Sequence, residues 1–105
     1  MTTSDPGDNS LRDIGAAELA DTPSMLKRLD KYAAHRNVEL VNMMRWQWLA
    51  MAERCRDLAD SNPGGLFRTL ISSRGWKQIT ADQLARGRRR YEEFLAAAIE
   101  GGAVP

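Results

Sequence analysis

The sequence predicts an all-α fold: a compact bundle of four or five helices behind a disordered acidic N-terminal tail. Three observations lead to this prediction. Apolar residues recur every three or four positions through four segments, which is the spacing of one helix face. Capping residues, two of them followed by Pro, start these segments, and Gly residues end two of them. With 105 residues, 43% hydrophobic and 28% charged, the chain supports one globular domain.

The N-terminal part, residues 1–21, is expected to be mostly a disordered acidic tail, because its first ten residues are polar and lack periodicity. A short helix capped by Ser10 is the alternative within this range, weakened by Gly15. Residues 1–22 carry a net charge of −4 and residues 61–95 a net charge of +4, although the whole chain carries only +1. Either the acidic tail screens the basic end, or both are solvated surfaces with different neighbours.

The single helical domain is predicted over residues 22–100, and its first helix over 23–36. Thr22 is a favourable N-cap and Pro23 falls at the first helical position, where its missing N–H costs nothing. One apolar face follows at helical spacing: Met25, Leu29, Tyr32 and Ala33. His35 lies in the last turn, where the helix dipole favours a cation, so we interpret it as a C-terminal cap.

The second helix is predicted over 38–60, with Asn37 as its cap. A continuous seam alternates in steps of three and four residues: Val41, Met44, Trp48, Met51, Cys55 and Leu58. A second stripe covers its flank: Leu40, Met43, Trp46 and Leu49. More than half of the helix surface is therefore apolar, which predicts the hub of the core. A coiled-coil dimer along the seam is the alternative, although three heptads are short for one.

The third helix is predicted over 63–74. Asn62 is its N-cap, Pro63 its first residue, and Gly75 ends it in a left-handed conformation. Gly64 and the next glycine in the first turn indicate close packing against the second helix; anion binding by the free N–H groups is the weaker alternative, because the Lys and Ser/Thr of a phosphate loop are missing.

The fourth helix is predicted over 81–99, ahead of a short tail at 101–105. Thr80 and Gln83 have the spacing of a capping box, and Ile79 with Leu84 that of a hydrophobic staple. The expected inner face contains Leu84, Gly87, Tyr91, Phe94 or Leu95, and Ala98. Gly87 would allow a close helix crossing, at a local cost of roughly 1 kcal/mol in helix propensity.

The sequence gives little support for a catalytic function, because the chain contains one His, one Cys and scattered carboxylates. We expect no enzyme, no catalytic residue, no cofactor and no metal site, and we interpret Cys55 as a small buried hydrophobe. No stretch has the length or apolarity of a membrane span or a signal peptide, so we expect a cytoplasmic protein without membrane contact.

The main functional pattern is a basic helix pair, ISSRGWKQITADQLARGRRRYEEF, which has the layout of a helix-turn-helix. Such a pair contacts DNA through polar and basic side chains. The candidates are Arg74, Lys77, Thr80, Gln83, Arg86, Arg89 and Arg90. The competing interpretation is a solvated face with i, i+4 ion pairs: Asp82–Arg86, Arg88–Glu92 and Arg89–Glu93. The alternative function is a protein–protein adaptor or homodimerising domain with Met43 and Trp46 as anchors.

The run NPGGLFRTLISSRGWKQITADQLARGRRR resembles a helical segment of bacterial and plasmid helix-turn-helix or replication-initiator proteins. The matching residues are Asn62, Pro63, Leu66, Phe67, Trp76, Ile79 and Thr80. The resemblance covers about a third of the chain. It implies a DNA-replication or gene-regulation context, but in such proteins the segment accompanies a separate DNA-binding domain. It therefore does not imply that this module itself contacts DNA.

Overall fold

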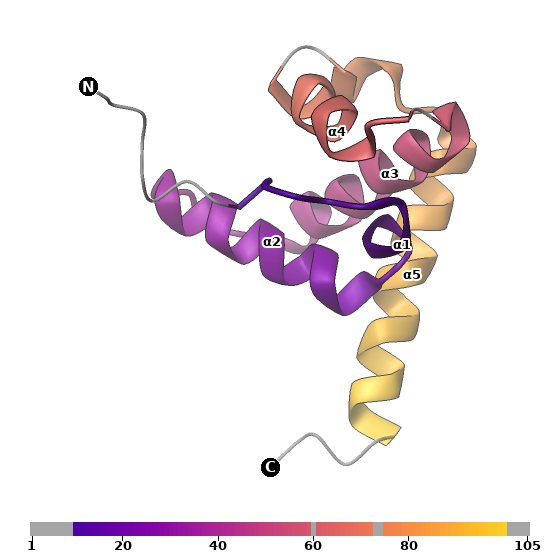
Figure 1. Ribbon diagram of the computed structural model, residues 1–105. Helices are drawn as coiled ribbons and strands as arrows, with labels where there is room; N and C mark the ends of the chain where they lie inside the picture. Colours follow the sequence, from indigo (N-terminus) through magenta and orange to yellow (C-terminus); the bar gives the residue numbers. More distant parts are fainter. Residues whose placement is uncertain (1–9, 60, 73–74, 101–105) are drawn as a thin grey trace.

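The computed structural model describes residues 10–59, 61–72 and 75–100, and every regular element in these ranges is helical (Figure 1). The predicted all-α class is confirmed. The elements are α1 (Ala16–Leu19), α2 (Thr22–His35), α3 (Asn42–Leu58), α4 (Pro63–Ser72), the 3₁₀ helix η1 (Gly75–Gln78) and α5 (Ala81–Glu100). In Figure 1, α2 lies across α5 rather than alongside it.

Helix α3 is the hub of the core, as predicted, because it contacts α1, α2, α4 and α5. Trp48 lies at its centre and is 1% exposed. Its indole Nε1 donates to the Met25 carbonyl at 2.9 Å, and its ring lies 5.1 Å from that of Tyr32 and 4.9 Å from that of Phe67. The middle of the predicted seam is thus covered by α2 and α4 of the same chain, which removes the basis for a coiled-coil dimer there.

The start of α3 differs from the prediction, since the helix begins at Asn42 rather than near residue 38. Asn37 does not cap it. Its φ is 55°, and the next amide, that of Val38, donates to the Ala33 carbonyl at 2.9 Å, a bond that closes the end of α2. The seam is also shorter than predicted, because Val41 is 52% exposed.

The N-terminal segment belongs to the core from Ser10 onward, which corrects the expectation of a tail over 1–21; residues 1–9 lie outside the described part. The buried apolar residues here are Leu11, Ile14 and Leu19. Arg28 of α2 holds the segment: its guanidinium donates to the carbonyls of Ser10 and Arg12 and pairs with Glu18. Backbone and side-chain acceptors from three residues thus bind one cation.

Gly64 allows α4 to pack closely against the N-terminal segment. A Cβ atom at this position would lie 2.9 Å from the carbonyl oxygen of Ile14. The close packing predicted for Gly64 therefore exists, but it is directed at the N-terminal segment and not at the second predicted helix. The N–H of Gly65 donates to Asn62 Oδ1 at 3.2 Å, which confirms Asn62 as the cap of α4.

Two other helix ends differ in detail. The N-cap of α2 is Asp21, whose carboxylate accepts from the Ser24 amide at 3.3 Å, and Thr22 is already helical. Helix α4 ends at Ser72, and residues 73–74 lie outside the described part. Gly75 is not in the left-handed region; it opens η1, and a Cβ there would lie 2.5 Å from the Leu70 carbonyl oxygen.

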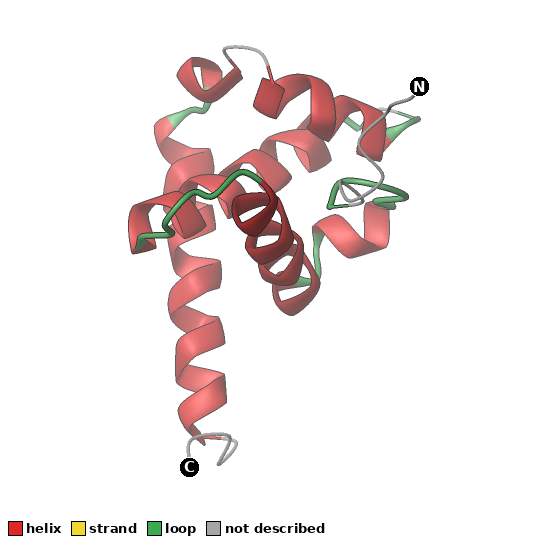
Figure 2. Cartoon of the chain, turned by 90° about the vertical axis from the view of Figure 1, so that its left-hand side faces the viewer, coloured by secondary structure: helices red, strands yellow, loops and turns green. Residues whose placement is uncertain are grey.

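Helix α5 crosses α3 closely at Gly87, as predicted. A Cβ atom on Gly87 would lie 2.5 Å from the Ala50 nitrogen and 2.6 Å from the Trp46 carbonyl oxygen. The expected inner face is confirmed at Gly87, Tyr91 and Phe94, but Leu84 is 40% exposed and the neighbouring Gln83 is buried in its place. The C-terminal part of α5 extends beyond the other helices in both ribbon views (Figures 1 and 2).

Candidate interaction surfaces

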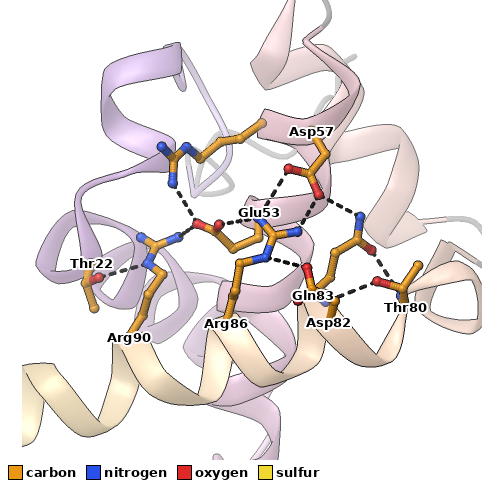
Figure 3. Close-up of polar contacts among 9 residues, drawn as sticks. Thr22, Glu53, Asp57, Thr80, Asp82, Gln83, Arg86 and Arg90 are labelled. Carbon is orange, nitrogen blue, oxygen red and sulfur yellow. Dashed lines mark hydrogen bonds and ion pairs between the residues drawn. The ribbon is translucent and has the colours of Figure 1, made fainter.

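The side of α5 that faces α3 carries an ion-pair cluster around Glu53 (Figure 3). The Glu53 side chain is 5% exposed and accepts from three guanidinium groups. Arg86 donates to its Oε1 at 2.9 Å, and Arg56 and Arg90 each donate to its Oε2 at 2.9 Å. A buried carboxylate of this kind is tolerated only because its oxygens are fully paired.

Asp57, one turn further along α3, extends the cluster. Arg86 Nη2 donates to Asp57 Oδ2 at 2.5 Å, and the Gln83 amide nitrogen donates to the same oxygen at 3.0 Å. These hydrogen bonds, that from Arg86 foremost, lower the pKa of Asp57 below its ordinary value. The same bond raises the pKa of Arg86, so both partners stay charged over the physiological range.

Arg90 is the most enclosed cation of the cluster, with a side chain 12% exposed. Its Nε donates to the Thr22 hydroxyl at 3.0 Å, and its Nη1 donates to Glu53. Burial lowers the pKa of Arg90, and the charge of Glu53 opposes that shift. The start of α2 and the middle of α3 are thus joined to α5 through one side chain.

The predicted nucleic-acid residues separate into two groups. Thr80 and Gln83 form the capping box: the Gln83 amide donates to the Thr80 hydroxyl and the Thr80 amide to Gln83 Oε1, both at 3.0 Å. With Arg86 and Arg90 turned toward α3, four of the seven side chains have partners inside the fold. Within the cluster, three arginines face an equal number of acids, Glu53, Asp57 and Asp82.

The second group consists of bases directed to solvent. Lys77 and Arg89 are exposed and form no ion pair among the described residues, and Arg74 lies outside the described part. Two of the predicted i, i+4 pairs exist, Asp82–Arg86 at 3.0 Å and Arg88–Glu92 at 3.3 Å. The third predicted pair, from Arg89 to Glu93, does not form between these described side chains.

The acids of the cluster were not predicted, although the spacing of residues in the sequence indicates them. Trp46, Ala50, Glu53 and Asp57 are spaced four, three and four residues apart, so the two acids continue the flank of α3 that carries Trp46. Charged residues that extend an apolar stripe indicate a buried partner rather than solvent. The complementary pattern lies on α5, where two of the partner arginines are one turn apart.

On another side of the same helix pair lies a groove of about 540 Å³. We call it the α3/α5 groove; its lining residues are Met43, Trp46, Gln47, Ala81, Leu84, Ala85, Arg88, Arg89 and Glu92. Met43 is 58% exposed and Leu84 40%. The Arg88 guanidinium lies over the Trp46 ring, 4.7 Å from its centre, a cation–π contact that restrains the indole. The structure thus brings both predicted protein-interaction residues into one surface.

The described part of the chain contains no group of three or more His, Cys, Asp and Glu residues positioned to hold a metal ion. Cys55 is buried, and His35 lies in the last turn of α2. None of the helices in the described ranges combines the length and apolarity needed to cross a bilayer.

Comparisons with protein-family models, with curated proteins and with solved structures find no match to this chain. The resemblance to replication-initiator segments therefore stays a prediction from the sequence.

Proposed function

We propose that this chain is a non-enzymatic helical interaction module that binds a protein through the α3/α5 groove. The observation that carries the proposal is the exposure of Met43 and Leu84 on either side of a half-buried Trp46. Met and Trp are enriched at protein interfaces, where large side chains bury apolar area without charge. Burial of such area is worth about 25 cal/mol per Å².

Two features favour the groove over the basic side as the binding surface. The arginines of the cluster are bound to acids of the same chain, so a ligand would have to compete with internal ion pairs. Binding to the apolar residues of the groove requires no competition with internal ion pairs. Its indole is also held in place by Arg88, so little side-chain entropy is lost on binding.

Site-specific photo-crosslinking in the native host tests this proposal. A photoreactive amino acid replaces Met43 in one variant and Lys31, an exposed residue of α2 outside the groove, in a matched control. We expect a discrete protein adduct from position 43 and none from position 31, and we expect Leu84→Glu to abolish it. Equal adducts from both positions, or none from position 43, would refute the proposal.

Nucleic-acid contact is the second candidate, supported by Lys77 and Arg89, two exposed bases of the predicted set that form no ion pair with a described acid. It would agree with the replication or gene-regulation context that the sequence resemblance implies. We expect salt-sensitive amide shifts near both residues when labelled protein is titrated with a short DNA duplex, and their loss in Lys77→Ala with Arg89→Ala. Arg86→Ala is unsuitable for this test, because it also removes a partner of Glu53. Absence of shifts even at low salt would exclude this candidate.

A further inference from the structure

One stripe of α5 is left uncovered along the length of the helix. Leu84, Leu95 and Ile99 are 40%, 42% and 67% exposed. Together with Arg88 and Glu92 they recur in steps of four, four, three and four residues, so they lie on one face. This face begins in the α3/α5 groove and continues onto the part of α5 that extends beyond the other helices (Figures 1 and 2).

The charged residues of this stripe lie between its apolar residues. An apolar residue, Leu84, stands at one end, the ion pair Arg88–Glu92 in the middle, and Leu95 with Ile99 at the other end. The separation of Leu84 and Ile99 along the helix axis is about 22 Å at 1.5 Å per residue. Read in the opposite direction, the two charges come in the reverse order, Glu92 before Arg88, so antiparallel copies bring unlike charges together.

Such a pattern is complementary to itself when two copies of α5 run antiparallel. With the two-fold axis at the level of residue 90, Arg88 of one copy faces Glu92 of the other, and Leu95 and Ile99 face Ala85 and Ala81, two small residues that line the α3/α5 groove. The two ion pairs meet at the centre, and each Arg88 then lies beside Glu92 of the second copy as well as its own. A ring of alternating charges replaces two separate pairs.

The shape of the surface agrees with this pairing. A symmetric dimer interface uses the same patch on both copies, so the patch must contain both a hollow and the group that fills it. The hollow is the α3/α5 groove, open beside Met43. The group is the end of α5 with Leu95 and Ile99. Both lie on one side of one chain, as a two-fold axis requires.

We infer that the α3/α5 groove receives the C-terminal part of α5 from a second copy of this chain, giving an antiparallel, two-fold symmetric dimer. This inference rests on the proposed protein-binding function and names its partner. A partner of different sequence would need one groove and one complementary helix, with no reason for a charge order that is complementary to itself in the antiparallel direction.

Charge reversal at the centre of the stripe tests the inference in sedimentation equilibrium with purified protein. We expect the wild type to dimerise, and Arg88→Glu and Glu92→Arg each to raise the dissociation constant about tenfold or more, because four like charges then meet. An equimolar mixture of R88E and E92R should restore dimerisation, because each copy then faces opposite charges. Asp30→Arg on α2 is the matched control and should leave the constant unchanged.

Two outcomes would overturn the inference: a wild type that stays monomeric at all concentrations, and a mixture that associates no better than each variant alone. A structural effect of R88E, including loss of its contact with Trp46, persists in the mixture and cannot mimic the rescue. A monomeric wild type that still forms the position 43 adduct with another protein would refute the dimer and leave the proposed function intact.

Discussion

Two sides of α5 carry charged residues four positions apart, Arg86 with Arg90 and Arg88 with Glu92, yet their surroundings differ. On the side toward α3, Arg86 and Arg90 reach Glu53, a carboxylate 5% exposed, and the charges are part of the core. On the outer side, Arg88 and Glu92 pair with each other at 58% and 59% exposure. Inner charges are costly to separate because no water replaces the lost partner, whereas outer ones are screened.

A run of basic residues on a helix therefore has no single structural role. The four arginines of the run RGRRR have three different roles. Arg86 and Arg90 join α5 to α2 and α3, Arg88 covers an indole, and Arg89 faces solvent. The direction of each side chain from the helix decides which task it has.

The largest expected difference is in the free energy of unfolding when one acid is removed from each set of ion pairs. Glu53→Ala leaves the enclosed Arg90 without its counter-ion and should lower the free energy of unfolding by about 3–5 kcal/mol. Glu92→Ala should cost about 0.5 kcal/mol or less in dilute solution. Urea denaturation of both variants measures the contrast, and equal losses would show that the inner cluster is no more than a surface pair.

A second pair of variants compares the two sides of α5 by their packing instead of their charge. Gly87→Ser places a Cβ against the backbone of α3 and should cost about 1–3 kcal/mol through overpacking. Ala96→Ser introduces the same residue on an exposed part of α5 and should cost about 0.5 kcal/mol through helix propensity alone. Thermal unfolding of both variants distinguishes the two, since about 1 kcal/mol shifts the midpoint by 4–8 °C. Similar midpoints would contradict the close crossing.

The smallest expected effect is in the pH dependence. Because the pKa of Asp57 is lowered in the folded chain, its contribution to stability is full above the unfolded value near 3.8 and is lost as the pH falls through the folded value. Asp57→Asn removes this titration. Between about pH 5 and pH 2 the wild type should therefore lose more stability than the variant, as measured by urea midpoints. Parallel losses would show that Arg86 does not stabilise the charged form.

The helix pattern was largely predictable because its causes are local. The Asn62 cap of α4 and the Thr80–Gln83 capping box act over three residues, and both are found as the letters indicate. The inner face of α5 was less predictable. Leu84 was expected to be buried, but it is exposed. The neighbouring Gln83 is buried instead, because its amide donates a hydrogen bond to Asp57 of α3.

Spacing, capping and the absence of a Cβ act within a few residues, so the letters alone predict the helical class, most helix starts, the hub role of α3 and the close crossing at Gly87. Two features follow only from the folded chain: which arginines are internal, and the packing of the segment from Ser10 into the core. Those outcomes depend on partners far along the chain, as between Arg90 and Glu53 or Gly64 and Ile14, and no local pattern specifies which distant groups meet.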